Sequence, residues 1–213
     1  MRRLENFLRK ISQNYTRRTY VLKCDIKKFF DSIDHDILLG LLNEQIKDED
    51  VIKLLEQIID SFHKEDGKGL PLGNVTSQVF ANVYMNKFDW FMKKELKVKY
   101  YIRYCDDFVI LSENINYLNE LLRYIEKFLI KELKLVLHPN KIEIKKLNQG
   151  IDFLGYVVLP HYLVLRTKTK NRVIRKLKIL SNNNDVFKYE RSKVSYLGVL
   201  SHCKSYKVRQ KLG

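Results

Sequence analysis

One segment limits the fold of this chain more than any other: KYYIRYCDDFVILS, residues 99–112. The residues on both sides of Asp106 and Asp107 alternate and are rich in β-forming types, which is typical of two strands joined by a tight acidic turn. A second β-rich run, YVLKCDI at residues 20–26, also carries a carboxylate near its end, that of Asp25. If the hairpin lies beside this strand, the three carboxylates converge.

The other segments alternate between helical and extended patterns. Short strands are expected at KIEI and within GIDFLGYVVL. This order predicts an α+β fold in which helices cover one face of an antiparallel sheet, and such a sheet can leave its other face open to a ligand. Apolar residues recur at helical spacing in residues 1–19, 33–62 (one broken helix or two), 76–96, 117–133 and 166–180, and a last helix runs through Tyr196 to Leu212.

The charge of the chain indicates a polyanionic partner. Lys and Arg number 40 against 25 Asp and Glu, which gives a formal net charge of +15 and a pI near 9.6. Nucleic acid is the first candidate, with an anionic membrane surface or a solvated basic surface as the alternatives. No stretch approaches the ~20 apolar residues that cross a bilayer, and MRRLENFLRK lacks the apolar core of a signal peptide. The three cysteines form no CxxC pair, so we expect a reducing cytoplasm and no structural zinc.

Three aspartates placed in this way suit phosphoryl transfer. Joining a 3′-hydroxyl to a nucleotide requires a lower hydroxyl pKa and neutralised phosphate charge, and two metal ions about 3.5–4 Å apart supply both. Magnesium prefers oxygen ligands, so Asp25, Asp106 and Asp107 with substrate phosphates would suffice. Each signal is weak by itself, because an Asp–Asp pair is usually a solvated turn. The apolar sequence around each acid favours the metal site, since an unpaired carboxylate is costly to bury.

Five motifs then resemble those of one family, in the family's order. YVLKCDIKKFFDSIDHDIL resembles the first catalytic motif of reverse transcriptases, GLPLGNVTSQVFANVYMNKFD the second, YIRYCDDFVIL the Y-x-D-D hairpin, HPNKIEI the fourth palm motif, and FLGY the primer grip. The final segment SYLGVLSHCKSYKVRQKL resembles thumb sequences of the same family. Within the family, the pattern GLPLGN-x-TSQ is most similar to reverse transcriptases of diversity-generating retroelements, with group II intron enzymes as more distant relatives.

The resemblance implies a domain order and an activity. Residues 1–19 would be a residual fingers segment, 20–165 the catalytic palm, and 166–213 a small helical thumb. The palm would extend a DNA or RNA primer with deoxynucleotides on an RNA template, using two Mg²⁺ ions for which Mn²⁺ can substitute. Asp25 and Asp106 would bind both ions, with Asp107 as the weaker ligand, and the Ile26 carbonyl would complete one coordination sphere.

The resemblance also places residues around the incoming nucleotide. Phe30 falls where the family has the bulky ring that excludes a ribose 2′-hydroxyl, although it could equally be a core aromatic next to Phe29. Gly73 would let the backbone approach the nucleotide or template, because a Cβ there would collide, or it is a plain turn before a helix. Leu72 replaces the Gln of many relatives, which implies low fidelity. Gln78 could contact the template or cap the helix.

The remaining family residues lie towards the C-terminus. Lys141 matches the fourth-motif lysine that can protonate pyrophosphate, though a lysine after a Pro–Asn turn is often only solvated. The primer grip would consist of Phe153, Leu154, Gly155 and Tyr156, and the alternative is a core strand. The thumb would grip the duplex backbone, where phosphate contacts add salt dependence without sequence information, or its basic face is merely solvated. The thumb residues are Arg172, Arg175, Lys176 and Lys178.

One part of the family pattern is missing. Relatives carry a basic fingers region before the first motif, and barely twenty residues stand there in this chain. The sequence therefore leaves three hypotheses: an N-terminally truncated enzyme, an enzyme that uses a separate fingers segment or accessory protein, or a non-catalytic nucleic-acid-binding remnant. A nucleotidyl cyclase also uses a palm with paired acids, but it needs neither FLGY nor a basic thumb. We expect a bacterial or phage-encoded cytoplasmic protein without a membrane partner.

Overall fold

The chain divides into two compact units in the computed structural model, which describes residues 1–182 and 186–210. The central unit comprises Thr19–Ile144. The terminal unit combines Met1–Arg18 with Lys145–Gly213. The central unit ends well before residue 165, and the functional division into fingers, palm and thumb stays a prediction.

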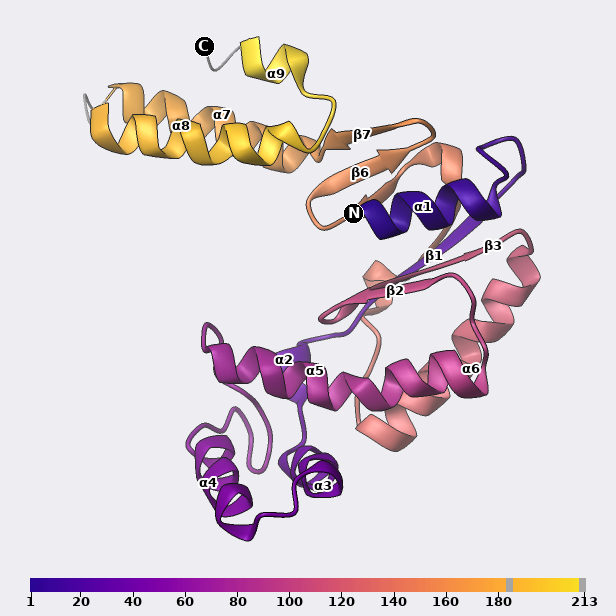
Figure 1. The fold of residues 1–213 in the computed structure, drawn as a ribbon, viewed down its shortest axis with the longest axis vertical. Helices are drawn as coiled ribbons and strands as arrows, with labels where there is room; N and C mark the ends of the chain where they lie inside the picture. Colours follow the sequence, from indigo (N-terminus) through magenta and orange to yellow (C-terminus); the bar gives the residue numbers. More distant parts are fainter. Residues whose placement is uncertain (183–185, 211–213) are drawn as a thin grey trace. The chain divides into compact units, whose positions relative to one another are not determined.

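A four-stranded sheet in the order β2-β3-β1-β4 forms the core of the central unit, and Figure 1 labels its strands β1, β2 and β3. β3 lies antiparallel to β1 and to β2, and the β1–β3 register runs from Tyr20 opposite Ser112 to Asp25 opposite Asp107. β-branched and aromatic side chains fit this pleated, largely buried surface, which is why the run through Val109 and Ile110 forms a strand. The strands are β1 (Tyr20–Asp25), β2 (Tyr101–Tyr104), β3 (Asp107–Ser112) and β4 (Glu143–Lys146).

Two separate helices occupy most of the stretch 33–62, so of the two alternatives the one with two helices is correct. Each begins at an aspartate cap: the Asp34 side chain accepts a hydrogen bond from the Ile37 N–H, and the Asp48 side chain accepts from the N–H groups of Asp50 and Val51. The central unit contains α2 (Phe29–Ser32), α3 (His35–Gln45), α4 (Glu49–Asp60), α5 (Val75–Trp90), the π-helical turn η1 (Phe91–Glu95), α6 (Ile115–Leu133) and the 3₁₀ turn η2 (Pro139–Lys141).

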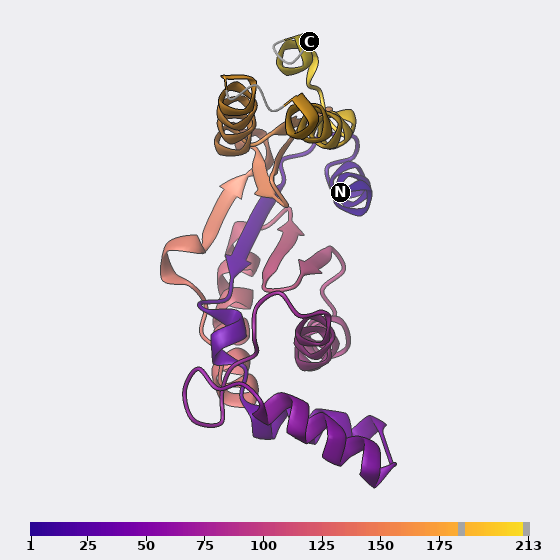
Figure 2. The ribbon, with the colours of Figure 1, turned by 90° about the vertical axis from the view of Figure 1, so that its left-hand side faces the viewer.

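Helices α5 and α6 cover one face of the sheet, as the sequence predicted; α5 is seen nearly end-on in Figure 2. Phe88 of α5 packs against Phe108 of β3 with ring centroids 5.2 Å apart, and both rings are fully buried. Val21 and Val109 alternate with the residues of this face and are buried too.

The terminal unit holds a second, three-stranded antiparallel sheet in the order β5-β6-β7. The apolar segment GIDFLGYVVL forms two of these strands, because Leu154 and Gly155 adopt positive φ values of 51° and 84° and turn the chain. Helices α7 and α8 lie side by side around Val173, Leu177 and Leu200 (Figure 1). The unit contains α1 (Arg2–Ile11), η3 (Leu147–Gln149), β5 (Ile151–Phe153), β6 (Tyr156–Leu159), β7 (Tyr162–Leu165), α7 (Thr167–Asn182), α8 (Val186–Ser201) and α9 (Tyr206–Gln210).

The architecture is α+β, as predicted. The expected end of the last helix at Leu212 lies outside the described residues. In the part of the chain that the structure describes, no helix is long and apolar enough to cross a membrane. Cys24, Cys105 and Cys203 are all free thiols.

Candidate active site

The three predicted aspartates meet at one end of the central sheet. Asp25 is the last residue of β1, and Asp107 is the first residue of β3 and its direct cross-strand partner. Asp106 stands next to Asp107 in the two-residue turn between β2 and β3. The convergence expected from the hairpin pattern is therefore present, and it follows from the register of β1 with β3.

The turn that carries Asp106 is held by backbone and side-chain contacts. Cys105 adopts a left-handed φ of 55°, which is uncommon for a residue other than glycine. The Asp106 carbonyl accepts a hydrogen bond from the Ile26 N–H at 3.2 Å. The Cys105 carbonyl accepts another from Arg103 Nη1 at 2.9 Å. Cys24 is fully buried as packing, whereas Cys105 is half-buried and forms part of the turn.

Burial of the acids perturbs their titration. Burial raises the pKa of Asp107 to about 6, although the Lys23 ammonium, 3.5 Å from Asp107 Oδ2, opposes this rise. Burial also raises the pKa of Asp106, to which the negative charge of Asp25 adds. Asp107 Oδ1 is buried and has no hydrogen-bond partner among the described residues. A carboxylate oxygen in this condition is available to a cation.

Lys141, the residue predicted from the fourth motif, lies directly at these acids. Its Nζ is 2.9 Å from Asp25 Oδ1 and 2.9 Å from Asp25 Oδ2. Two backbone hydrogen bonds keep the preceding segment beside β1: the His138 N–H donates to the Asp25 carbonyl at 2.8 Å, and the Lys27 N–H donates to the Val136 carbonyl at 2.9 Å. Lys141 thus neutralises Asp25 from a segment far away in the sequence.

The oxygen atoms of this site fit a hard divalent cation. Carboxylates are the ligands that Mg²⁺ prefers. The charge of a cation would offset both causes that raise the Asp106 pKa, which are burial and, after it, the negative charge of Asp25. The predicted backbone ligand is the Ile26 carbonyl oxygen. It accepts neither of the two hydrogen bonds that form the Ile26–Leu137 bridge. Within residues 1–182 and 186–210, however, no three His, Cys, Asp or Glu side chains are already grouped to hold a metal. Because Lys141 engages both Asp25 oxygens, metal binding requires this ion pair to open.

The residues expected around the nucleotide also belong to the central unit. Phe29 is buried, whereas Phe30 is half-buried and meets it edge to face with ring centroids 5.4 Å apart. Leu72 is 75% exposed, and Gln78 is exposed in the first turns of α5. Gly73 has a φ of 96°, and no described atom of the chain lies within 4 Å of where its Cβ would be. Within the chain the backbone angle therefore favours glycine, and the collision of a Cβ with a bound nucleotide or template stays a prediction.

The predicted primer-grip and thumb residues belong to the terminal unit. Phe153 is 1% exposed and packs as a core residue, whereas Leu154 and Gly155 form the turn. The Tyr156 hydroxyl donates to the Val199 carbonyl at 3.1 Å. The four predicted thumb residues, all on α7, are exposed, while Val173 and Leu177 face inward. The acids and Lys141, by contrast, all belong to the central unit.

Three charged residues near the turn were missed by the sequence analysis. Lys23 pairs with Asp107, and Arg103 forms a bidentate ion pair with Asp89 of α5. The signal that could have identified Lys23 and Arg103 is a charged residue inside an otherwise apolar strand. Such a charge is costly to bury unless a partner lies nearby.

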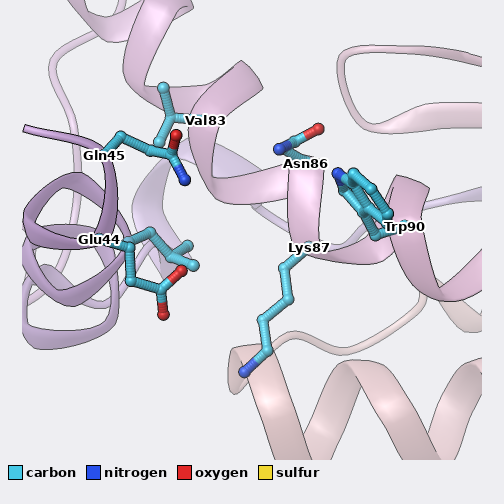
Figure 3. Close-up of a pocket in the computed structure, with 7 residues that line it drawn as sticks. Glu44, Gln45, Val83, Asn86, Lys87 and Trp90 are labelled. Atoms are coloured by element: carbon cyan, nitrogen blue, oxygen red, sulfur yellow. The ribbon is translucent and has the colours of Figure 1, made fainter.

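Two hollows in the central unit lie outside the group of acids. The larger one, of about 330 Å³, lies between α3 and α5, where the Trp90 ring and the Glu44 and Gln45 side chains border it (Figure 3). The smaller one, of about 160 Å³, is bordered by four lysines together with two carboxylates and a serine. Neither is lined by a residue that the sequence analysis selected for catalysis. The smaller hollow is lined by Lys28, Asp31, Ser32, Lys64, Glu65, Lys68 and Lys134.

An antiparallel sheet with helices on one face and carboxylates at a hairpin turn is typical of a polymerase palm. Residues 1–158 match the family described as reverse transcriptase (RNA-dependent DNA polymerase), and the chain belongs to this family. Members of the family generally use divalent metal ions.

Similar proteins include intron-encoded ones. The chain is 23% identical over 201 residues to the putative COX1/OXI3 intron 2 protein of Saccharomyces cerevisiae. This match covers 65% of this chain and 24% of that protein. It is 31% identical over 99 residues to the group II intron-encoded protein LtrA of Lactococcus lactis subsp. cremoris, with 44% and 16% covered. The chain thus spans about a quarter or less of the length of these two relatives.

Solved structures with the same fold include telomerases. Telomerase from Candida tropicalis, in complex with a fragment of telomeric RNA, matches with a TM-score of 0.62 at 13% identity, over 99% of this chain and 39% of that one. Apo telomerase of the same organism, truncated from the C-terminal domain, matches with a TM-score of 0.60 at 16% identity, over 78% and 39%. At these identities the likeness concerns the fold alone.

Proposed function

We propose that the chain is the catalytic part of an RNA-directed DNA polymerase that adds deoxynucleotides to a primer 3′-hydroxyl. One observation carries the proposal: the register of β1 with β3 sets Asp25 opposite Asp107, with Asp106 in the adjoining turn. RNA template, primer and dNTPs are the proposed partners, together with a separate fingers segment or an accessory protein. The net charge of +15 supports a nucleic-acid partner.

Two Mg²⁺ ions, or Mn²⁺ in their place, are the proposed cofactors. Asp25, Asp106, Asp107 and the Ile26 carbonyl would hold them. Bound there, divalent ions would lower the pKa of the primer hydroxyl and neutralise charge on the phosphate oxygens. The unpartnered Asp107 Oδ1 supports this assignment, because a buried carboxylate oxygen without a donor is costly unless a cation satisfies it.

Lys141 has two tasks in this proposal. Without substrate it neutralises Asp25, and its 52% exposed side chain can leave that carboxylate without losing a packed position. Released from Asp25, the ammonium can donate a proton to the pyrophosphate leaving group as a general acid. Phe30 would exclude the ribose 2′-hydroxyl, and Leu72, Gly73 and Gln78 would border the nucleotide and template.

The terminal unit would hold the nucleic acid. Leu154, Gly155 and Tyr156 would contact the primer end, and the burial of Phe153 leaves its backbone for the same task. The exposed basic face of α7 would bind the duplex backbone, since phosphate contacts need only accessible positive charge. Low fidelity, and with it a diversity-generating role, rests on Leu72, whereas the similarity to intron-encoded proteins supports a group II intron-like origin.

Primer extension tests the proposal. The chain, alone and with an added N-terminal fingers segment, is supplied with a primed homopolymer RNA, dNTPs and Mg²⁺. We expect incorporation that disappears in Asp106→Ala, because a proposed metal ligand is lost. Asp66→Ala, which changes an exposed loop carboxylate, is the matched control and should retain activity. Full activity of Asp106→Ala would contradict the site, and binding of the hybrid without incorporation would favour the non-catalytic alternative.

A further inference from the structure

Arg103 connects the turn of the acids to helix α5. It lies on β2, two residues before Cys105, and its side chain is only 9% exposed. Its Nη2 and Nε donate to Asp89 Oδ2 and Oδ1 at 2.5 and 2.9 Å, and its Nη1 donates to the Cys105 carbonyl at 2.9 Å. One guanidinium thus joins a helix carboxylate to the backbone of the turn.

Asp89 is held firmly at the other end of this connection. It lies near the C-terminal end of α5, and the Tyr101 hydroxyl donates to its Oδ1 at 2.7 Å. Burial alone would lower the pKa of Arg103, but the hydrogen bonds and the charge of Asp89 outweigh it and raise this pKa. The guanidinium therefore stays charged, and Asp89 receives three donors from β2.

The turn needs such support. Cys105 has a left-handed φ, a conformation that non-glycine residues keep only where the surroundings impose it. Arg103 restrains the carbonyl of this same residue, and the Ile26 N–H restrains the carbonyl of Asp106 from the other side. These two carbonyls flank the Cα atom of Asp106. Holding both of them therefore fixes the backbone position from which the Asp106 side chain extends.

We infer that Arg103 and Asp89 act together as a positioning clamp, which fixes the Asp106–Asp107 turn against α5 and thereby prepares the carboxylates for divalent cations. This inference rests on the proposed polymerase function. Neither residue touches a reacting atom; both act through the turn. An arginine is required, because only its planar fork donates in two directions to a carboxylate while a further N–H reaches a carbonyl.

Arg103→Lys tests the clamp, because it keeps the charge and removes the fork. We expect the Mg²⁺ concentration for half-maximal primer extension to rise about ten-fold. Mn²⁺ binding, followed by electron paramagnetic resonance without nucleic acid, should weaken by a similar factor. Binding of an RNA–DNA hybrid should change less than two-fold, since the clamp concerns the acids alone. Asp89→Asn should produce the same changes, and the double variant should add little, as expected of two partners in one interaction.

A second ion pair on the same helix provides the matched control. Lys87 of α5 extends towards α6 (Figure 3), and its Nζ pairs with Glu132 Oε2 at 2.9 Å. Lys87→Met removes an ion pair from α5 without touching the turn. It should leave both metal readouts at the wild-type value, even where its thermal midpoint falls as far as that of Arg103→Lys.

The outcomes separate the clamp from the polymerase function. Unchanged Mn²⁺ binding in both Arg103→Lys and Asp89→Asn would overturn the clamp, as would an equal loss in Lys87→Met. Weakened Mn²⁺ binding in the two clamp variants alone supports it, even if the wild-type chain extends no primer. If the wild-type chain extends no primer and the two clamp variants still bind Mn²⁺ more weakly, the proposed polymerase function fails and the positioning role stands. Where Arg103→Lys does not fold, Asp89→Asn carries the same comparison.

Discussion

Phe29 and Phe30 show how neighbouring residues of one type take different roles. Phe29 is 3% exposed and belongs to the core of the central unit, whereas Phe30 is half-buried at its edge. The Phe30 carbonyl accepts a hydrogen bond from the Leu70 N–H at 2.8 Å, which fixes its backbone beside the segment leading to Gly73. An accessible ring with a fixed backbone is what a steric gate requires. The arrangement favours Phe30 over Phe29 as that gate.

A steric gate at Phe30 predicts how a substitution there changes sugar selection. Phe30→Ala should raise the ratio of ribonucleotide to deoxynucleotide incorporation about ten-fold, or roughly 1.4 kcal/mol, because space opens for the 2′-hydroxyl. Phe30→Tyr keeps the ring and should keep the wild-type ratio. Competition between matched rNTPs and dNTPs in primer extension measures the effect. The same ratio in an active Phe30→Ala enzyme would assign Phe30 to the core.

Leu72 is the residue on which the fidelity proposal rests. It is 75% exposed, so its side chain is accessible to a bound nucleotide. An amide at this place could hydrogen-bond the incoming nucleotide, a contribution of about 1–2 kcal/mol, or roughly five- to thirty-fold in discrimination. We therefore expect Leu72→Gln to lower the error rate by up to this factor with little change in overall activity.

Sequencing of cDNA copied from one defined RNA compares the two proteins. Val75→Gln is the control, because Val75 is 76% exposed and lies close by at the start of α5. It should reproduce the wild-type error spectrum. If Leu72→Gln also reproduces the wild-type error spectrum, Leu72 no longer supports a mutagenic role or an assignment to the diversity-generating subgroup.

Helix α5 is the element that connects the parts of the central unit. Its N-terminal end follows Gly73, its C-terminal end carries Asp89, and the Tyr84 hydroxyl in between donates to the Leu133 carbonyl of α6 at 2.7 Å. The same hydroxyl accepts from the N–H of Asp34, the cap of α3, at 3.3 Å. These contacts link the segment after Gly73, the helices α3 and α6, and the acidic turn through one helix.

At the scale of the whole molecule, chemistry and charge are divided between the two units. The central unit contains the acids and the proposed nucleotide site, whereas the terminal unit contains the exposed basic face of α7. Phosphate contacts contribute to affinity whatever the base sequence. Their contribution falls as the salt concentration rises, because the release of counterions from the nucleic acid then yields less free energy. We therefore expect substitutions on α7 to weaken nucleic-acid binding, and substitutions of the acids to slow the reaction.

Salt dependence tests the binding role of α7. Arg175→Ala combined with Lys178→Ala should reduce the slope of log affinity against log salt for an RNA–DNA hybrid by about 1–2, since each lost phosphate contact removes just under one. The control combines Arg123→Ala with Lys127→Ala, two exposed cations on α6. Fluorescence anisotropy over a salt series compares the two variants. Equal slopes would show that the α7 charges are only solvated.

The sequence by itself determined the local parts of this protein. Alternation and β-forming residues fix the β2–β3 hairpin, and helical spacing fixes α5 and α6, because these patterns depend on which face of one element is buried. The family motifs identified the residues now found at the end of the sheet. Lys141 was selected in the same way, although its ion pair with Asp25 spans 116 residues of sequence.

Only the tertiary structure decided what depends on packing between distant segments. It showed Phe153 as a core residue, and it showed that Gly73 is favoured by its backbone angle within the chain. It also revealed the contact of Arg103 with Asp89 and Cys105, which no spacing rule predicts. A side chain's partner across elements depends on register and helix placement, and these emerge only when the whole core is packed.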